Sequence, residues 1–226
     1  MGEHVAILAL DTTTVVATAA IVRQGYVLAE VALGVQRNHA ERILPAIDFI
    51  MREAGLKPSQ LARVAVCIGP GSFTGQRIGL SLAKGLAEGL GIPLVPVSTL
   101  KLLAEQLSMF EGIVVPLLDA QRNEYYGAVF RSRGGVVERL VADQTFNRQE
   151  LGSLLSNYSG EPVMLTGEAA EEAGLKQSLR VAPPPWRMPR ASVLGLLAEN
   201  TQGVDSKAVI PNYIRSSSAK PRKNGE

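Results

Sequence analysis

The sequence predicts an α/β fold made of two successive, related units, and three observations lead to this prediction. Each unit opens on a continuous apolar run, "VAILAL" in the first and "GIVVPLLDA" in the second, as is typical of a strand buried on both faces. A hairpin pattern follows each run. Segments with apolar residues at helical spacing lie between the strands. Together these features suggest a weak internal duplication.

The composition is that of a folded chain with a nearly neutral body. The 226 residues are 46% hydrophobic and 19% charged, which fits one large domain or two small ones. The formal net charge is +2, and three basic residues against one acidic lie in the last eleven positions. The remaining body carries 20 basic and 20 acidic residues. A protein that binds nucleic acid by itself usually has a basic surface, and here that signal is confined to the end of the chain.

The single cysteine and the lack of long apolar runs exclude several classes of protein. Cys67 alone allows no intrachain disulfide and no cysteine-based zinc site. No signal-peptide pattern precedes the first apolar run, and no run is long enough to span a bilayer. We therefore expect a cytoplasmic protein without membrane contact.

The first unit is expected to cover residues 1–100. Its hairpin turns at Gln24-Gly25, and Gly55 and Gly91 are the expected ends of its two helices. The expected elements, in order, are a strand at 5–10, hairpin strands within 15–33, a helix at 38–54, a strand at 61–68, a glycine-rich loop, a helix at 77–90 and a strand at 94–98.

The second unit is expected to cover residues 101–190, with a hairpin turning at Gly134-Gly135. Its expected elements are a helix at 100–110, a strand at 112–120, hairpin strands within 124–141, a helix at 148–158, a strand at 162–167, a helix at 168–176 and an extended "PPPW" at 183–186. Residues 191–215 read as a last helix followed by an extended segment, and 216–226 as a disordered, solvated basic tail.

The loop in "CIGPGSFTGQRIG", residues 67–79, has two interpretations. A helix N-terminus behind a glycine-rich loop can bind phosphate. However, a P-loop needs Lys and then Ser or Thr where this chain has Gln76 and Arg77, and a dinucleotide fingerprint starting at Gly69 meets Thr74 instead of glycine. The alternative is a tight turn and a helix start capped by Ser72 or Thr74. A residual phosphate loop would comprise Asp11, Thr12, Gly69, Gly71 and Ser72.

The helix after the loop carries two different faces. Its large apolar residues, Ile78, Leu82, Leu86 and Leu90, are expected to face the core. Beside them runs a row of small residues that would allow close packing, either against the helix at 40–54 or against a second chain. Leu80 and Phe49 are expected to face solvent, which favours the second chain. The candidate interface residues are Ile43, Ile47, Ile50, Gly75, Ile78, Gly79, Leu80, Leu82, Ala83, Leu86 and Ala87.

No set of residues supplies a nucleophile, a base and an orienting group together. Asp11 and Asp119 each follow a buried strand, and a single carboxylate there reads most simply as a turn residue. His4 and His39 are the only histidines, too few for a typical catalytic zinc or iron site. Cys67 lies in an apolar strand and is expected to be a buried structural thiol. The sequence predicts no catalytic residue, no metal and no cofactor.

Six segments in order resemble the TsaB family, a bacterial factor for threonylcarbamoyladenosine formation in tRNA. They are "ILALDTTT", "NHAERILPAI", "GPGSFTGQRIG", "VSTLKLLAE", "DAQRNEYYGAVF" and "PNYIR". The resemblance implies an actin-like, ribonuclease-H-like α/β architecture of two related lobes, with the segment after residue 190 packed back on the first lobe. One departure is Gln76, where the family usually has an aliphatic residue.

The resemblance also implies a role. The family is similar to TsaD, the subunit that transfers the threonylcarbamoyl group, but "VSTLKLLAEQL" lacks the histidine pair that TsaD carries in the corresponding stretch. It implies a non-catalytic partner that binds TsaD through first-lobe helices, forms a homodimer through the same surface, acts with the ATPase TsaE, and meets tRNA only within the complex. The alternative from another class is an actin-like nucleotide-binding enzyme (an ATPase or kinase) or a metallopeptidase-like hydrolase.

Overall fold

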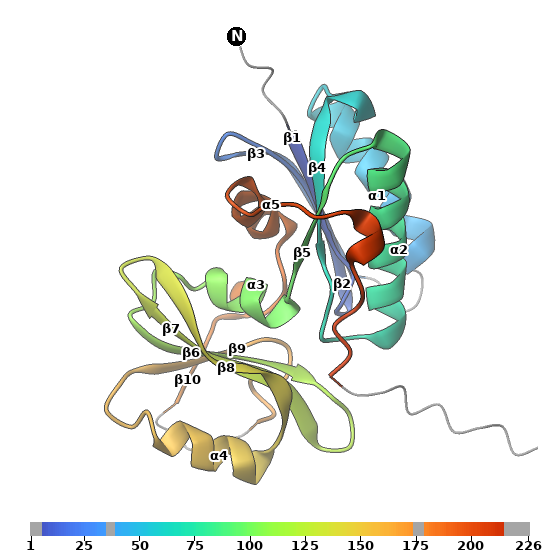
Figure 1. The fold of residues 1–226 in the computed structure, drawn as a ribbon. Coiled ribbons are helices and arrows are strands. Elements are labelled where there is room, and N and C mark those ends of the chain that lie inside the picture. The colour runs from blue at the N-terminus through green and yellow to red at the C-terminus, as the bar shows by residue number, and fades with distance from the viewer. Residues whose placement is uncertain (1–5, 35–38, 174–178, 215–226) are drawn as a thin grey trace, which may run out of the picture.

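The computed structural model describes residues 6–34, 39–173 and 179–214, which form two lobes, each built on a mixed sheet (Figure 1). His4 and the tail at 216–226, for which the sequence suggested no function, lie outside the described residues. No helix in the described ranges has the length and apolarity needed to cross a membrane.

The first sheet has the strand order β3-β2-β1-β4-β5. Its strands are β1 (Ala6–Asp11), β2 (Val16–Arg23), β3 (Tyr26–Gly34), β4 (Leu61–Cys67) and β5 (Leu94–Val97). The central strand β1 is antiparallel to β2 and parallel to β4, so one half of the sheet is a hairpin and the other is parallel.

The second sheet repeats this arrangement. Its order is β10-β9-β6-β7-β8, with β6 (Gly112–Asp119) in the centre, antiparallel to β7 and parallel to β9. The remaining strands are β7 (Glu124–Arg133), β8 (Val136–Asn147), β9 (Val163–Thr166) and β10 (Arg180–Val181). Because the first strand of each lobe is central and each hairpin lies on its antiparallel side, the predicted duplication is confirmed.

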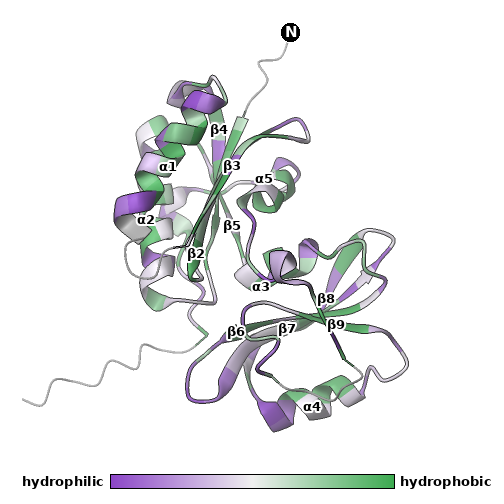
Figure 2. Cartoon of the chain, turned by 180° about the vertical axis from the view of Figure 1, so that it is seen from behind, coloured by the Kyte–Doolittle hydropathy of each residue, from purple (hydrophilic) through white to green (hydrophobic). Residues whose placement is uncertain are grey.

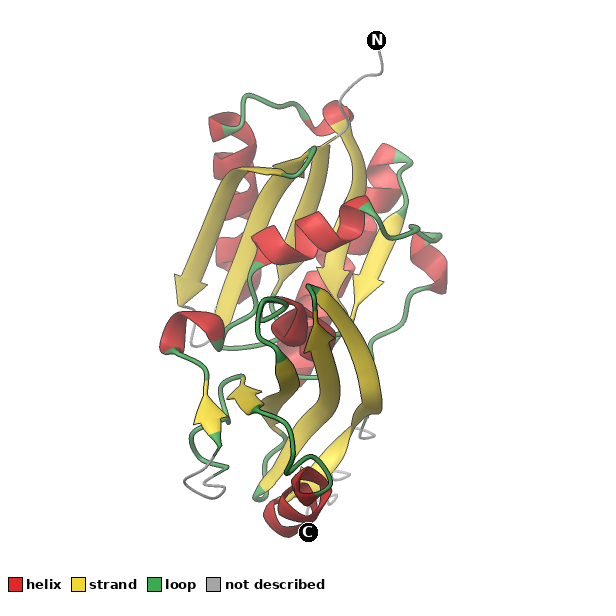
Figure 3. Cartoon of the chain, turned by 90° about the vertical axis from the view of Figure 1, so that its left-hand side faces the viewer, coloured by secondary structure: helices red, strands yellow, loops and turns green. Residues whose placement is uncertain are grey.

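Helices cover both faces of the first sheet (Figures 1 and 3). On one face lie α1 (His39–Glu53) and α2 (Phe73–Leu90), and on the other lies α5 (Ala191–Glu199). In the second lobe α3 (Thr99–Glu105) lies on the sheet face nearer the first lobe, and α4 (Arg148–Ser156) covers the opposite face. Short 3-10 turns are η1 (Pro58–Gln60), η2 (Pro184–Trp186) and η3 (Ser206–Ala208).

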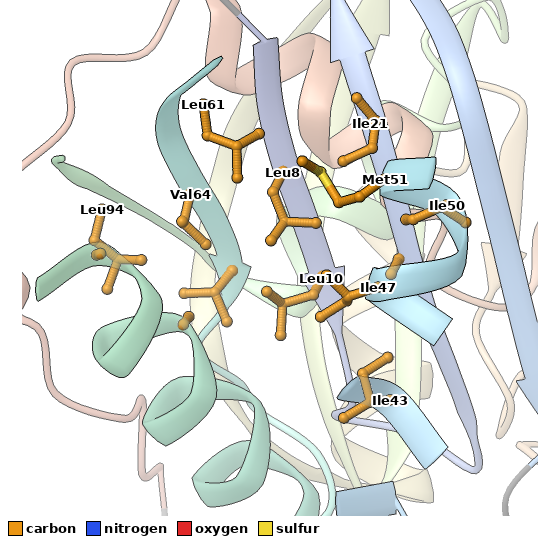
Figure 4. Packing of buried hydrophobic residues seen from close by; sticks show 14 of the residues in the cluster. Leu8, Leu10, Ile21, Ile43, Ile47, Ile50, Met51, Leu61, Val64 and Leu94 are labelled. Carbon is orange, nitrogen blue, oxygen red and sulfur yellow. The ribbon is translucent and has the colours of Figure 1, made fainter. Parts of the chain in front are cut away.

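Aliphatic side chains and alanine fill the space between each sheet and its helices. The central strands are largely hydrophobic along their length (Figure 2), as expected where both faces are covered. Between the first sheet and its two long helices, Leu8 and Leu10 of β1 meet Ile43, Ile47 and Ile50 of α1 (Figure 4). This core fixes the position of α1 and α2 relative to the end of β1.

Several predicted turns are confirmed and two predicted segments are wrong. The hairpins turn at Gln24-Gly25 and Gly134-Gly135, and Gly55 and Gly91 end α1 and α2 in left-handed backbone. Of the helix predicted at 168–176, residues 168–173 form turns, where the amide of Ala169 donates to the oxygen of Leu117 on β6, and residues 174–176 lie outside the described residues. Residues 184–186 form a 3-10 turn rather than an extended segment, since proline is well suited to the first positions of such a turn.

Asp143 of β8 joins the two lobes. Its carboxylate accepts hydrogen bonds from Ser98 at the start of α3 (2.6 Å) and from the side chain of Asn212 near the end of the described chain (3.0 Å), and it pairs with Arg139. The backbone amide of Asn212 in turn donates to Ile68 after β4. The segment after η3 therefore contacts the first lobe and the second-lobe sheet at one point.

Candidate functional site

The glycine-rich loop at residues 69–72 connects β4 to α2 and lies directly against the turn that follows β1. The amide of Ser72 donates to the oxygen of Thr13 over 2.7 Å. A Cβ at Gly71 would collide with that same oxygen, and a Cβ at Gly75 would collide with the oxygen of Thr12. The two glycines thus allow two backbones to approach closely, which is a packing reason for the pattern.

Amides that an anion would need are already used inside the loop. Ser72 is the N-cap of α2, as predicted: its hydroxyl accepts from the amide of Gly75 and its carbonyl from the amide of Gln76. The Gln76 side chain is 3% exposed and fills the space beneath Gly69, with Nε2 donating to the oxygen of Gly71 over 3.0 Å. A phosphate in this loop would have to displace the Gln76 carboxamide.

Asp11 and Thr12 are both buried and both hold the turn together. The Oδ1 atom of Asp11 accepts from the amide and hydroxyl of Thr13, and the Thr12 hydroxyl donates to the oxygen of Gly75. Cys67, at the end of β4, is buried beside Asp11. Burial raises the pKa of its thiol, and the Asp11 carboxylate raises this pKa further. Cys67 is therefore a buried thiol kept in its neutral form, as expected from its strand position.

Asp119 occupies in the second lobe the place that Asp11 has in the first, at the end of the central strand. It is exposed, and its Oδ1 accepts from the amide of Gln121 over 2.6 Å. Burial raises the pKa of the Glu168 carboxyl, and the charges of Asp119 and Asp11 raise it further. Carboxylates of both lobes thus face the same region, but no group of three or more possible metal ligands forms among the described residues.

The predicted faces of α2 are correct for its core-facing leucines and wrong for Leu80 and the small residues. Leu82, Leu86 and Leu90 pack against the first-lobe core as expected, while part of their surface stays exposed. The small-residue row (Gly75, Gly79, Ala83 and Ala87) is buried against the chain's own sheet. Ala83 is 0% exposed and Leu80, expected to face solvent, is 4% exposed. The physical reason is that small residues bring a helix axis close to a flat sheet just as they bring it close to another helix. A second chain cannot reach this row without unfolding the lobe.

The α1 residues proposed for the interface are also in the core. Ile43, Ile47 and Ile50 point at the sheet (Figure 4) and are buried. By contrast, Phe49 is exposed as predicted, and Leu44 is exposed too. On α2 we define the half-exposed row as Ile78, Leu82 and Leu86. Leu82 and Leu86 pack against the core on one side, and the exposed part of this row is the apolar surface of α2 that a partner can reach.

The sequence did not predict one group of side chains near the loop. The guanidinium of Arg77 lies over the ring of Phe73, 3.8 Å from its centroid, and its Nε donates to the hydroxyl of Tyr213 over 2.8 Å. We call these three residues the cation–aromatic cluster. Tyr213 is 136 positions from Arg77 in the sequence, so no local spacing could have signalled the contact.

Comparisons with known proteins agree with this architecture. The family model for tRNA N6-adenosine threonylcarbamoyltransferase (TsaD) matches residues 20–220. The chain is 31% identical over 223 residues to the tRNA threonylcarbamoyladenosine biosynthesis protein TsaB of Bacillus subtilis, covering 96% of each chain.

Solved structures show the same fold. A Pseudomonas aeruginosa protein described as similar to the peptidase YEAZ aligns with a TM-score of 0.82 at 24% identity, over 93% of this chain and 100% of that one. The activator of 2-hydroxyisocaproyl-CoA dehydratase from Clostridium difficile aligns with a TM-score of 0.51 at 9% identity, over 88% of this chain and 99% of that one. The match to a TsaB along nearly the whole length, together with the duplicated sheets, shows that the chain belongs to the TsaB family and has its actin-like α/β fold of two related lobes.

Proposed function

We propose that the chain is a non-catalytic subunit for the formation of threonylcarbamoyladenosine in tRNA, and that it binds and supports the transferase TsaD. The similarity to the TsaB biosynthesis protein of Bacillus subtilis, over 96% of both chains, is the observation that carries the proposal. Because such coverage includes both lobes, the whole chain rather than one domain has the expected role.

The interior of the glycine loop supports a non-catalytic role. An actin-like enzyme that bound a nucleotide here would need the loop amides and the Asp11 turn for its phosphates and metal ion. In this chain three of those amides, Asp11 Oδ1 and the Thr12 hydroxyl are committed to internal hydrogen bonds, and Gln76 fills the loop. These contacts stabilise the packing of α2 on β1 and leave the loop as a support for that helix.

The outer surface of α1 and α2 is the proposed site for TsaD. Phe49 and Leu44 of α1 are exposed, and the half-exposed row runs along α2. Apolar side chains on two neighbouring helices of a rigid core are typical of a protein–protein interface. In this proposal a homodimer uses the same surface and therefore competes with TsaD, while TsaE joins the assembled pair and tRNA meets the chain within the complex.

Reconstitution tests the role directly. Threonylcarbamoyladenosine formation on a tRNA transcript is measured with the purified TsaD and TsaE of the same organism, with and without this chain. We expect modification to require the chain, and Gln76→Ala, which empties the loop, to retain activity. Full modification of the transcript by TsaD and TsaE without the chain would contradict the proposal. Micromolar binding of ATP and magnesium to the isolated chain, measured by calorimetry, would instead favour a nucleotide-using enzyme.

A further inference from the structure

The cation–aromatic cluster is an exposed group of two rings and one cation at the start of α2. Phe73 is 39% exposed and Tyr213 is 40% exposed, with their ring centroids 5.4 Å apart. The Arg77 guanidinium lies over the Phe73 ring and is held in place by the Tyr213 hydroxyl. Part of each ring stays exposed beside a fixed positive charge, although Arg77 covers one face of Phe73. Exposed aromatic rings beside a cation are the groups on which unpaired nucleic-acid bases stack.

Basic residues predominate in the two stretches of sequence that supply the cluster, and the acidic groups lie at their borders, where Glu88 accepts a hydrogen bond from Ser206 and Asp143 accepts one from Asn212. Residues 68–87 contain Arg77 and Lys84 and no acidic residue. The described residues 206–214 contain Lys207 and no acidic residue, and the sequence beyond them holds Arg215, Lys220, Arg222 and Lys223 before Glu226. The whole chain has 23 basic against 21 acidic residues, so an acid-free stretch at both segments departs from its average. A polyanion is the complementary partner.

The N-terminus of α2 adds to the positive electrostatic potential at the cluster. The cluster lies at the N-terminus of an 18-residue helix, where the helix dipole is positive, and the first turn of that helix contains no acidic residue. An acidic protein segment would satisfy this charge but would leave the two aromatic faces without planar partners. Single-stranded RNA satisfies both, with phosphates for the cations and bases for the rings.

We propose that Phe73, Arg77 and Tyr213 form a contact surface for single-stranded RNA, with unpaired bases stacking on the rings and a phosphate beside Arg77. The inference rests on the proposed function, because the RNA is then a looped or terminal region of the tRNA substrate. The chain thereby orients tRNA on the complex without taking part in the chemistry.

Fluorescence anisotropy tests the surface with the full-length chain, alone and with TsaD. The probes are a labelled tRNA transcript and a blunt-ended RNA duplex of equal length. Phe73→Leu and Tyr213→Leu remove an aromatic face but keep apolar bulk, Tyr213→Phe keeps the face, and Arg77→Gln removes the charge. Tyr26→Leu is the matched control, since Tyr26 is an exposed tyrosine on β3. Thermal unfolding establishes that each variant is folded.

We expect the transcript to bind more tightly than the duplex, and each leucine variant to weaken transcript binding at least about fivefold. Tyr26→Leu retains affinity, and Tyr213→Phe loses less affinity than Tyr213→Leu because it keeps the ring and removes only the hydroxyl that holds Arg77. Arg77→Gln lowers the slope of log affinity against log salt by about one. Equal binding of duplex and transcript, or equal loss in Tyr26→Leu, overturns the proposal. So does loss of TsaD association in the leucine variants, because the cluster is then a protein interface. RNA binding through the cluster by a chain that does not pair with TsaD would refute the proposed function and leave this inference standing.

Discussion

Gly75 lies where the first turn of α2 crosses the turn after β1, and its missing side chain sets the distance between them. A Cβ there would collide with the backbone oxygen of Thr12, which cannot move without disturbing β1. We expect Gly75→Ala to lower the free energy of unfolding by about 3 kcal/mol. Gly85, in the same helix with open space around it, is the control: Gly85→Ala should raise stability by up to about 1 kcal/mol. Urea unfolding of both variants measures the difference, and equal effects would refute the packing explanation.

Glu168 provides a pH-dependent test at the level of one carboxyl group. Burial and the charge of Asp119 raise the pKa of this group in the folded chain, so folding favours its protonated form. Its ionisation therefore costs stability as the pH rises above the ordinary carboxyl pKa of about 4.3. Glu168→Gln should stabilise the fold at neutral pH, and the gain should vanish below about pH 4. Denaturant unfolding across this range measures the gain. Glu53→Gln, at an exposed position of α1, is the control and should change the unfolding free energy at neutral pH by less than about 0.5 kcal/mol.

At the scale of the element, α2 shows what periodicity can and cannot predict. The spacing of its residues predicted the helix, its Ser72 cap and its Gly91 end, because these depend on local backbone chemistry. It failed to predict that Leu80 and the small-residue row are buried more deeply than the leucines, because a four-residue row of small side chains suits a sheet as well as a second helix. The cation–aromatic cluster was missed for another reason: its partners come from distant parts of the chain.

The corrected face of α2 leads to a direct stability prediction. Ala83→Arg places a charge where the side chain is fully enclosed, and an uncompensated buried charge costs roughly 3 to 5 kcal/mol. We therefore expect this variant to be largely unfolded or strongly destabilised. Ser81→Arg, at an exposed position of the same helix, should change the unfolding free energy by less than about 0.5 kcal/mol. Circular dichroism during urea unfolding compares the two, and a fully stable Ala83→Arg chain would place the row outside the core.

At the scale of the whole molecule, the duplicated sheets explain why so much of the fold could be predicted. Each lobe begins with a buried strand and a hairpin, and these signals are local. The contact between the lobes is not local, since Asp143 accepts hydrogen bonds from Ser98 and Asn212, which come from separate segments. No sequence pattern marks such a meeting point.

Removing the Asp143 carboxylate should weaken the contact between the two lobes. Asp143→Ala leaves Ser98 and Asn212 without their acceptor, so we expect faster amide hydrogen exchange at residues 94–98 and 209–213, while the central strands keep their protection. Asp48→Ala, which breaks an exposed ion pair with Arg52, is the control and should leave these amides unchanged. Unchanged exchange in Asp143→Ala would show that other contacts hold the lobes.

The central claim is that this chain pairs with TsaD through the outer surface of α1 and α2. Its most direct test is calorimetric titration of the organism's TsaD with the wild-type chain, Phe49→Arg, Leu86→Arg and the distant control Tyr26→Arg, after each variant has been shown to be folded. We expect wild type and Tyr26→Arg to bind alike, and the two α1–α2 variants to bind at least about tenfold more weakly. Wild-type affinity in both folded α1–α2 variants, or no pairing by the wild type, would contradict the account.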